Sequence, residues 1–560
     1  MFLMEKQCTA CTALFTVSSE DRAFLDRLAP VIGGTPITLP DPTHCPDCRQ
    51  QRRLAFRNDS NYYKNTCFSC KKNIISIYSP DKHLPVLCHD CFWSDNWDPL
   101  AYGKAVDFSR PFFEQYAALK KAVPRLSIFN TQSENSDYTV HASKNKNCYM
   151  SCSTMRSENV YFSDWAIDST DCADLVMCSN MELCYACDES RRCFASSYLE
   201  LCSNVSESYL CFDCHASQEL VGCVSLKNKT CMILNEPSDK KTVEETIHRL
   251  NTDPAFRLSF QVQYDALKLR MPKRAAWNLN TEDSTGNYLQ NAKGAHHCYS
   301  SMDLEDCRYV YDAIDMKDCM DTTRGSFAEH LYECKGSTDL FLSCFSNLGY
   351  QCDNLLYCDN SNSSSYCFGC FSVKKMKYCI LNKQYTKEEY ETLVPKIIEH
   401  MKTTGEWGEF FPIAISSFGY NETKAFENYP LSKEEILQRG WLWSDFDQPP
   451  VTDIKLIQAE SIPSDINDVP DDILNYIIAS EGSGKPFRII PQELAFYRKR
   501  GLPVPHHHPQ ERLRKLALLE TPRALYSRTC AKCQKPIETT YAPDRRETVL
   551  CEECYLKEVY

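Results

Sequence analysis

The chain has 560 residues, 43% of them hydrophobic, and a formal charge of −13 at pH 7. A chain of this length exceeds one ordinary domain and can bury a sizeable core, so we expect several domains. Met1 to Lys6 contain no basic region followed by an apolar run, and no 18-residue apolar stretch occurs, so neither a signal peptide nor a membrane span is predicted. We therefore expect a soluble cytoplasmic protein.

The charges and the cysteines are unevenly distributed along the chain. Residues 1–125 carry 16 basic and 13 acidic side chains, and residues 485–560 carry 15 and 9, so the ends are basic and the middle is acidic. Of the 34 cysteines, 12 form Cys-x-x-Cys pairs near the two ends and 22 lie in the middle. In a reducing compartment the paired cysteines are typical zinc ligands, and the others are expected to be buried thiols.

The first four cysteines form two such pairs, and each pair can bring two thiolates to one tetrahedral ion. This segment resembles the "probable zinc-ribbon" family of small bacterial domains over about 45 residues. The resemblance implies a bound zinc ion and no activity. A long loop before the second pair departs from the family's pattern. The matching residues are Cys8, Cys11, Phe15, Val17, Glu20, Phe24, and Cys45-Pro46-Asp47-Cys48-Arg49.

A second set, Cys67-x-x-Cys70 and Cys88-x-x-Cys91, has 17 residues between its pairs, a spacing typical of a zinc site. The same module recurs 463 positions later, with matching apolar and turn residues between the pairs. We therefore predict three zinc ribbons with three structural zinc ions and no cofactor of another kind. The ligands of the third ribbon are Cys530, Cys533, Cys551 and Cys554.

The segment before the last ribbon aligns with the first ribbon but has lost its cysteines. Serine hydroxyls are poor ligands beside thiolates, so the sequence predicts a degenerate ribbon without metal. We interpret the run His506 to His508 as an exposed polar turn. By position, Ser480 replaces Cys8, Ser483 replaces Cys11, His508 replaces Cys45 and Glu511 replaces Cys48.

The middle of the chain contains two copies of a cysteine-rich repeat, at about 147–235 and 297–382. Small apolar residues recur in steps of 9 or 12 in the first copy and, 147 positions later, in the second. Ile233-Leu234-Asn235 recurs as Ile380-Leu381-Asn382. Two repeat units, roughly 18 to 24 residues, would form one turn of a stacked-strand coil, which gives about four turns and a height of about 20 Å per copy.

We therefore expect a mainly β protein, with two tandem cysteine-rich β-solenoid (β-helix-like) blocks flanked by zinc-ribbon pairs, and with short helices. Cysteine is small and soft enough to stack in ladders inside such a block. Disulfides or further metal sites are the alternatives. In an alternating strand, residues three apart point to opposite faces, which argues against metal sites at the repeat pairs. Those pairs are Cys184 with Cys187, Cys211 with Cys214, and Cys367 with Cys370.

Helices and an aromatic strap are predicted around the blocks. Phe108 to Tyr116 is expected to form a strap and a short helix, Ser238 to cap a second helix, and Thr386 with Glu389 to form a capping box. The predicted domains are zinc ribbon 1 (1–56), zinc ribbon 2 (57–98), a strap (99–135), block 1 (136–237), a helical insertion (238–280), block 2 (281–383), a helix with strap and acidic linker (384–478), the degenerate ribbon (479–525) and zinc ribbon 3 (526–560).

The sequence contains no recognisable catalytic set. Asp168, Asp171, Asp315 and Asp318 recur in both copies, but they recur in step with the repeat, as turn residues do, so a β-helix hydrolase or lyase is the weakest hypothesis. Basic residues near the ribbons could bind RNA or DNA phosphates, or could be a solvated face that pairs with the acidic middle. These candidates are Arg49, Arg52, Arg53, Arg57, Arg498, Lys499, Arg500, Arg512, Arg514 and Lys515.

The order of the parts, a ribbon pair, two repeat blocks and a second ribbon pair, resembles uncharacterised bacterial zinc-ribbon proteins with cysteine-rich repeats. That resemblance implies no activity. Our leading hypothesis is a non-enzymatic zinc-binding scaffold or adaptor that binds a macromolecule, protein or nucleic acid, through its ribbon ends. The alternatives are a nucleic-acid-binding zinc-ribbon protein and a β-helix polysaccharide-active enzyme. The sequence also leaves open whether homo-oligomers form through solenoid or ribbon contacts.

Overall fold

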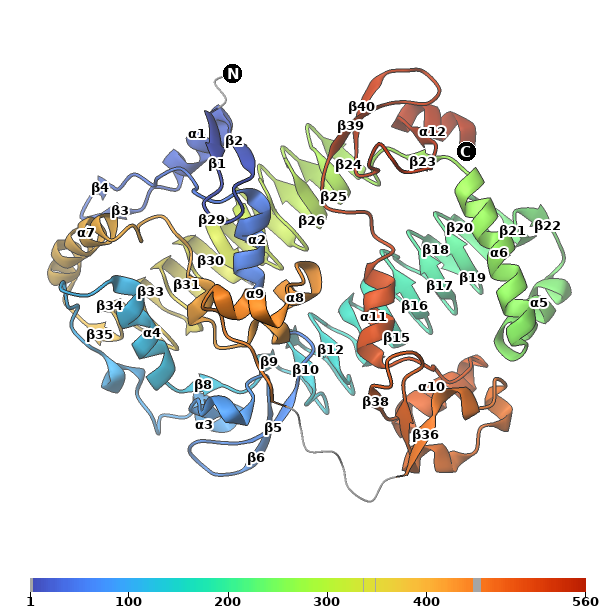
Figure 1. Ribbon diagram of the computed structural model, residues 1–560, viewed down its shortest axis with the longest axis horizontal. Helices are drawn as coiled ribbons and strands as arrows, with labels where there is room; N and C mark the ends of the chain where they lie inside the picture. The colour runs from blue at the N-terminus through green and yellow to red at the C-terminus, as the bar shows by residue number, and fades with distance from the viewer. Residues whose placement is uncertain (1–3, 336, 348, 447–454, 560) are drawn as a thin grey trace. The chain divides into compact units, whose positions relative to one another are not determined.

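The computed structural model describes residues 4–335, 337–347, 349–446 and 455–559 (Figure 1). The chain divides into two compact units: unit 1 contains residues 1–128 and 277–447, and unit 2 contains 129–276 and 448–560. Each unit combines one cysteine-rich repeat with a ribbon region from a distant part of the sequence. The expectation of a mainly β protein is confirmed. Within the described residues, no helix is both long and apolar enough to cross a bilayer.

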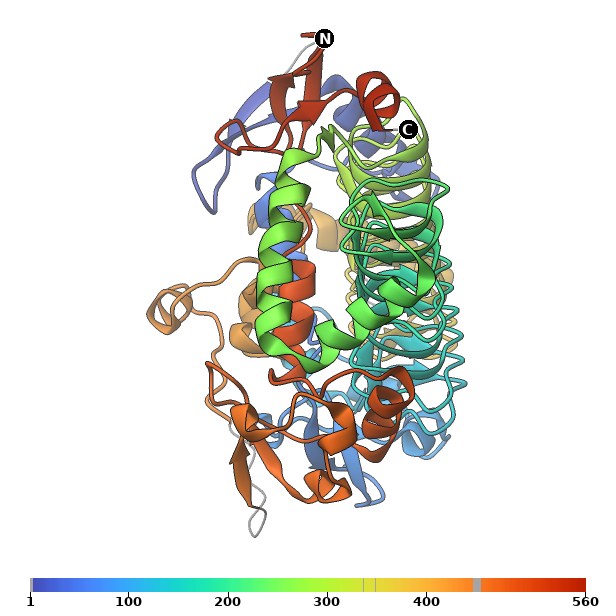
Figure 2. The ribbon, with the colours of Figure 1, turned by 90° about the vertical axis from the view of Figure 1, so that its right-hand side faces the viewer.

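Each repeat forms a ladder of parallel strands, visible as stacked arrows in Figure 1 and as stacked loops of chain in Figure 2. In the first ladder, in unit 2, residues pair with those 12 positions later, from Glu134 with Lys146 to Gln218 with Thr230. The second ladder, in unit 1, keeps the same register from Gly286 to Cys379. The prediction of 18 to 24 residues per turn is wrong, because one turn takes 12. The first ladder therefore has about eight turns and a height of roughly 38 Å.

The strands of the first ladder are β10 (Thr139–Val140), β12 (Ser151–Cys152), β13 (Glu158–Tyr161), β14 (Asp164–Ile167), β15 (Thr170–Ser179), β16 (Tyr185–Asp188), β17 (Ser197–Glu200), β18 (Ser203–Ser206), β19 (Tyr209–Phe212), β20 (His215–Val221), β21 (Thr230–Ile233) and β22 (Glu236–Pro237), with β9 (Asn130–Thr131) and β11 (Ala142–Ser143) paired beside them. Those of the second are β24 (Leu279–Glu282), β25 (Gly286–Lys293), β26 (Cys298–Glu305), β27 (Ile314–Lys317), β28 (Met320–Thr323), β29 (Ser326–Lys335), β30 (Ser337–Cys344), β31 (Gly349–Leu356), β32 (Ser361–Asn362), β33 (Ser365–Phe368), β34 (Lys377–Ile380) and β35 (Lys383–Gln384).

The backbone is left-handed at nearly every third described residue of both ladders. Asn147 has φ 54° and Met150 has φ 50°, for example, and the series continues in steps of three. This conformation costs a non-glycine residue about 1–2 kcal/mol, so contacts with the neighbouring turns must stabilise it. The side chain that follows a left-handed residue is buried at most positions, as in the series Cys148, Ser151, Thr154, Ser157 and Val160. The true repeat is therefore three residues, and the predicted steps of 9 and 12 are multiples of it.

The buried serines and cysteines carry hydrogen bonds from turn to turn. The Ser163 hydroxyl donates to the carbonyl of Tyr161 at 3.0 Å and accepts from the amide of Leu175, one turn later, at 3.1 Å. The Cys358 thiol is placed in the same way, 3.4 Å from the carbonyl of Leu356 and 3.5 Å from the amide of Cys370. A small side chain with one polar atom thus satisfies two backbone groups that face the interior.

The repeat cysteines are free thiols in this structure. Cys184 and Cys187 are both fully buried, so the expectation that residues three apart face opposite sides of a strand is wrong here. The left-handed residue between them turns the chain, and both side chains point inward. Burial raises the pKa of Cys178, which keeps this interior thiol protonated.

An asparagine side chain closes the last turn of each ladder. The Asn235 amide accepts from the backbone N–H of Val224 and donates to its carbonyl, both at 2.9 Å. Asn382 makes the same pair of bonds with Phe371, also at 2.9 Å. Each amide side chain therefore makes the two hydrogen bonds that the backbone of a further turn would make. The recurring Ile-Leu-Asn sequence marks the ends of the two ladders.

Equivalent helices pack on the two ladders. In unit 1 a Cβ added at Gly369 would lie 2.3 Å from Phe112 of α4 (Phe112–Ala122), and in unit 2 one added at Gly222 would lie 2.6 Å from Phe260 of α6 (Pro254–Arg270). Both glycines have φ near 60°, so glycine satisfies both the turn and the close approach of the ring. The pair of contacts indicates that the two units share one internal arrangement.

The helix caps test two predictions. Ser238 is wrong as an N-cap, because the side chain of Asp239 caps α5 (Lys240–Thr252) by accepting from the amide of Thr242. The capping box of Thr386 and Glu389 is confirmed at the start of α7 (Lys387–Thr403). The other helices beyond the ribbons are α8 (Lys424–Asn428), α9 (Lys433–Gln438), α10 (Pro491–Arg500) and α11 (Pro509–Ala517).

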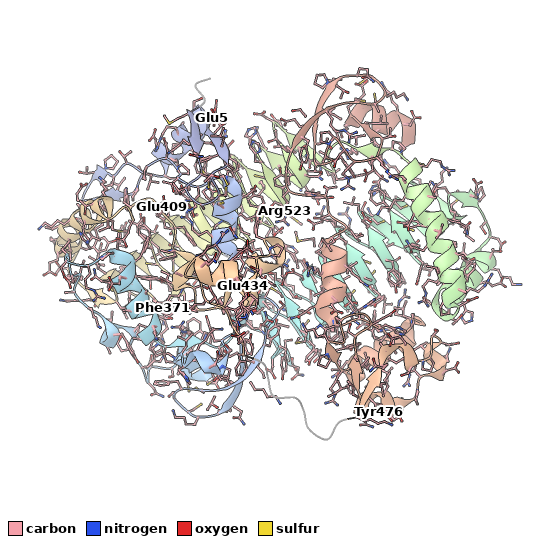
Figure 3. The ribbon with its side chains drawn as sticks, viewed as in Figure 1. Glu5, Phe371, Glu409, Glu434, Tyr476 and Arg523 are labelled. Atoms are coloured by element: carbon pink, nitrogen blue, oxygen red, sulfur yellow. The ribbon has the colours of Figure 1, made fainter. Side chains whose placement is uncertain are left out.

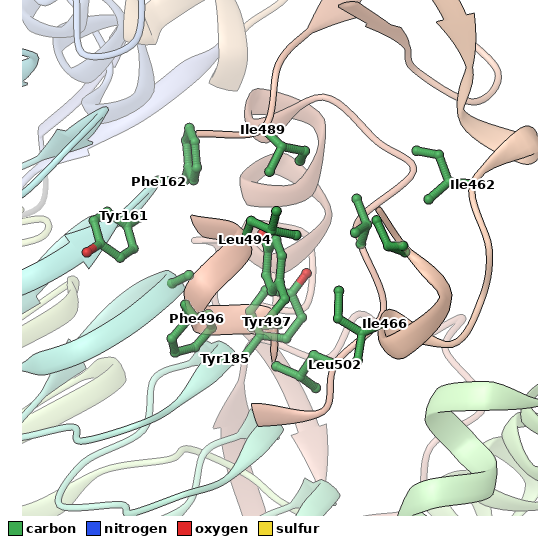
Figure 4. Close-up of a cluster of buried hydrophobic side chains, with 14 of the residues drawn as sticks. Tyr161, Phe162, Tyr185, Ile462, Ile466, Ile489, Leu494, Phe496, Tyr497 and Leu502 are labelled. Atoms are coloured by element: carbon green, nitrogen blue, oxygen red, sulfur yellow. The ribbon is translucent and has the colours of Figure 1, made fainter. Parts of the chain in front are cut away.

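A hydrophobic cluster joins the degenerate ribbon to the first ladder within unit 2 (Figure 4). It includes the segment interpreted from its sequence as an acidic linker, in which Ile466, Val469 and Ile473 are buried. The acidic side chains of this segment lie outside and the apolar ones inside. The strands of this region are β36 (Leu456–Gln458), β37 (Ile477–Ala479) and β38 (Pro486–Phe487).

Candidate metal centres

The first four-cysteine group joins a hairpin to a helix. Cys8 and Cys11 lie between β1 (Met4–Gln7) and β2 (Leu14–Val17), and Cys45 and Cys48 lie at the start of α2 (Pro46–Leu54). The four sulfur atoms all lie within 4.8 Å of one another, and those of Cys11 and Cys45 are 3.7 Å apart. A tetrahedral ion with metal–sulfur bonds of about 2.3 Å requires sulfurs about 3.8 Å apart, so the group fits a zinc-sized ion. The remaining elements of this ribbon are α1 (Ser19–Arg27), β3 (Val31–Ile32) and β4 (Thr35–Pro36).

The second group is built in the same way from β5 (Tyr63–Thr66), β6 (Asn73–Ser76) and α3 (His89–Trp93). Its ligands are Cys67, Cys70, Cys88 and Cys91, with 3.9 Å between the sulfurs of Cys70 and Cys88. The backbone amide of Cys88 donates to the sulfur of Cys67 at 3.3 Å. Strand β7 (Val86–Leu87) pairs with β8 (Arg125–Leu126), which fixes the ribbon within unit 1.

The third group, in unit 2, repeats this geometry between β39 (Tyr526–Thr529), β40 (Pro536–Thr539) and α12 (Glu552–Val559). The sulfurs of Cys533 and Cys551 are 3.8 Å apart. Strand β41 (Val549–Leu550) pairs with β23 (Lys273–Arg274), as β7 pairs with β8. The ligand set is Cys530, Cys533, Cys551 and Cys554.

Backbone amides favour the thiolate form at one cysteine of the second group and at one of the third. Burial opposes ionisation of Cys67, but hydrogen bonds from the amides of Cys88 and Cys70 outweigh it and lower the pKa of this thiol to about 6. Amides of Cys533 and Cys551 act in the same way on Cys530 and lower its pKa to about 6. Thiolates are the form that binds metal, and Cys67 and Cys530 are the cysteines of these two groups whose surroundings favour it. Burial raises the pKa of Cys88 to about 12, and the hydrogen bond with Cys551 raises that of Cys554 to about 12.

All four positions around each ion would be filled by sulfur. A four-thiolate centre leaves no position for water or substrate, so it supports a fold and does not act as a Lewis acid. The three groups are the ones that the described part of the chain contains with ligand atoms close enough to share an ion. Three metal sites with these twelve ligands are therefore compatible with the geometry.

The degenerate ribbon has a hydrogen-bond network where the first ribbon has its cysteines. The hydroxyl of Ser480 donates to the carboxylate of Glu511 and accepts from the amide of His508, the latter at 2.9 Å. Burial lowers the pKa of His508 to about 3, so this imidazole is neutral at physiological pH. Hydrogen bonds, one of them to a carboxylate, thus hold together the two halves that a metal ion would join.

The basic residues predicted beside the first ribbon are buried against the second ladder. Arg49 lies 2.7 Å from Asp321, and the Arg53 side chain is fully buried 3.4 Å from the same carboxylate. Arg52 contacts Glu333 at 2.5 Å and Glu409, labelled in Figure 3, at 2.6 Å. Side chains in this position are not available to a phosphate backbone. Arg57 pairs with Asp59 at 2.7 Å and is also buried.

The basic residues of unit 2 are divided between ion pairs and the surface. Arg512 is buried 3.1 Å from Asp174, which corresponds to Asp321 at the 147-residue offset of the repeat. Lys499 pairs with Asp171 at 2.9 Å, and Arg498 pairs with Asp471 at 2.5 Å. Burial lowers the pKa of the half-buried Arg500, Lys515 lies 2.7 Å from His507, and Arg514 is exposed.

The acidic ladder residues that anchor the ribbons were not predicted from the sequence. Asp321 and Asp174 occupy the same place in the two repeats, just as Arg49 and Arg512 occupy the same place in the two ribbons. These two correspondences, between the repeats and between the ribbons, could have identified the two ion pairs from the sequence. The sequence matches no protein-family model and no curated protein. The resemblance to zinc-ribbon proteins therefore stays a prediction from the motifs.

Proposed function

We propose that this protein is a non-enzymatic, zinc-stabilised scaffold or adaptor that binds a macromolecular partner through its ribbons. The observation that carries the proposal is the presence of three closed four-thiolate groups, which have no position for catalysis. Zinc is the proposed ion because four thiolates in a tetrahedron are its usual structural ligand set. The two ladders are proposed to be β-solenoids of 12 residues per turn that hold the ribbons.

The recurring aspartates support a structural rather than a catalytic role. Asp168 pairs with Arg156 at 2.7 Å, Asp171 pairs with Lys499, and Asp318 lies 3.5 Å from Arg27. A catalytic carboxylate pair requires two acids facing one reacting bond in a cleft. These acids instead face cations on the outside of the ladders, so a polysaccharide-active enzyme is the weakest alternative.

The ion pairs also bear on the nucleic-acid alternative. Most of its candidate contacts are paired with carboxylates. Arg514 and Lys515 are exposed, and Arg498 and Lys499 are exposed as well but pair with Asp471 and Asp171. These few side chains release few counterions, so any affinity for RNA or DNA should be weak and should fall only slightly with salt. A filter-binding titration with single-stranded RNA and duplex DNA at 50 and 200 mM salt checks this. Tight, steeply salt-dependent binding would favour the alternative.

Metal analysis tests the proposed zinc centres. Native mass spectrometry of the intact protein should give three zinc ions per chain, and chelation should remove them with loss of ribbon structure. A protein that folds fully with no zinc would refute the zinc-stabilised scaffold. A fourth ion would require ligands outside the three groups.

A further inference from the structure

A cleft of about 1040 Å³ lies beside the first four-cysteine group, wholly within unit 1. Its walls come from the turn that carries Cys11, α2 with the residues before it, the start of α4, the segment that follows α7, and the residues that follow α9. This volume is at the upper end of the range for ligand-binding clefts. The space therefore suits several residues of an extended chain better than a single small ion.

The lining of the cleft is partly apolar. Phe113, Phe410, Pro412, Ile413 and Trp441 contribute side chains to it. The Trp441 ring is packed against Tyr420, with 5.1 Å between centroids, and the guanidinium of Arg439 lies 5.2 Å from its centre. Trp441 is thus held in one orientation while remaining half-exposed. A rigid aromatic wall favours apolar side chains of a partner.

The charge of the cleft is negative. Its acids are Glu114, Glu406 and Glu409, and its cations are Arg52 and Arg439. Arg52 pairs with Glu333 and Glu409, and Glu406 accepts hydrogen bonds from the amides of Phe112 and Phe113. The three acids and two cations of the lining therefore carry a formal charge of −1. Four thiolates around a zinc ion would add a net charge of about −2 on the side of Cys11 and Cys48. This environment repels phosphates and attracts a basic side chain with an apolar stem.

We propose that this cleft binds an extended basic segment of a partner protein. A lysine or arginine side chain would point toward the thiolate face and Glu114, and neighbouring apolar side chains would lie against Ile413 and Trp441. The inference rests on the proposed zinc-stabilised adaptor and names the chemistry of its partner. It assigns recognition to the acidic face of the first ribbon, because the arginines on the other face are buried against the second ladder.

Fluorescence anisotropy with the full-length, zinc-loaded protein tests the proposal. The probes are a labelled peptide of about ten alternating lysines and leucines, the same peptide with glutamate in place of lysine, and a single-stranded DNA oligonucleotide of similar length. The lysine peptide is expected to bind, and the glutamate peptide and the oligonucleotide are not. Glu114→Lys should weaken the binding of the lysine peptide about fivefold, and Ile413→Ser should weaken it by a similar factor.

Glu399→Lys is the matched control, because Glu399 is also an exposed helical acid with a nearby basic partner but does not line the cleft. It should leave the affinity unchanged. Equal binding of the glutamate peptide, or equal effects of Glu114→Lys and Glu399→Lys, would overturn the cleft assignment. Absence of lysine-peptide binding by a protein that carries three zinc ions would reject the cleft alone, whereas absence of zinc would reject the scaffold proposal itself.

Discussion

Arg49 and Asp321 form an ion pair inside unit 1 in which neither side chain is more than 2% exposed. Removing one partner of such a pair leaves a buried charge without compensation. Arg49→Met should lower the free energy of unfolding of unit 1 by about 3 kcal/mol, at the lower end of the usual range because Arg53 still lies near the carboxylate. Urea denaturation followed by tryptophan fluorescence measures the change. Arg514→Met, at an exposed position, is the control and should change stability by less than about 0.5 kcal/mol.

At the scale of single residues, the sequence predicted the grouping of the twelve cysteines but not the anchors. Cys67 and Cys70 belong to one local turn, so their spacing alone indicates that they act as a pair. The partner of Arg49 lies far away in the chain, and no local pattern shows that a basic helix will face a buried aspartate. Arg49 was therefore interpreted as a candidate phosphate contact, although burial now places it inside the protein.

At the scale of elements, the hydroxyls of inward-facing serines connect neighbouring turns of a ladder by hydrogen bonds. Ser163→Ala would leave the amide of Leu175 and the carbonyl of Tyr161 without the hydroxyl that now serves both. An unsatisfied buried polar group costs about 1–3 kcal/mol, so unit 2 should lose stability by that amount. Ser163→Cys should be tolerated much better, because cysteines occupy equivalent positions in both ladders. Thermal unfolding of the two variants measures the difference, and equal losses would contradict the proposed role of the hydroxyl.

The ladders were predicted as repeats, but their turn length was not. Cysteine is the most conspicuous repeated residue in the sequence, but it occupies only some inward positions and therefore recurs in steps of 9 and 12. Serine, alanine, threonine and leucine fill the intervening positions and hide the three-residue period. The left-handed residues that create the turns are chemically diverse, from Asn147 to Trp165, because the conformation is imposed by the neighbouring turns. Asn and Asp, such as Asp168 and Asp315, tolerate this conformation and occupy many of these positions, but they mark only part of the series.

At the scale of the whole molecule, metal loss should affect one ribbon at a time. Cys530→Ser removes a ligand of the third group, and the binding free energy of a closed site contributes directly to folding. We expect two zinc ions per chain by native mass spectrometry and faster amide exchange in residues 526–559 only. Ser480→Ala, in the degenerate ribbon, is the control and should leave all three ions bound. Loss of every ion from the Cys530 variant would contradict independent ribbons.

The asparagine that closes each ladder has a consequence for assembly. A ladder end with unpaired backbone groups is a template on which an identical end from another molecule can add. Asn235→Gly keeps the left-handed backbone but exposes the N–H and C=O of Val224. This variant should polymerise end to end at concentrations where the parent protein and the Asn228→Gly control sediment as one species in analytical ultracentrifugation. Two amide side chains, together with the antiparallel strands β22 and β35, thus limit the growth of a strand stack that could otherwise continue into a filament.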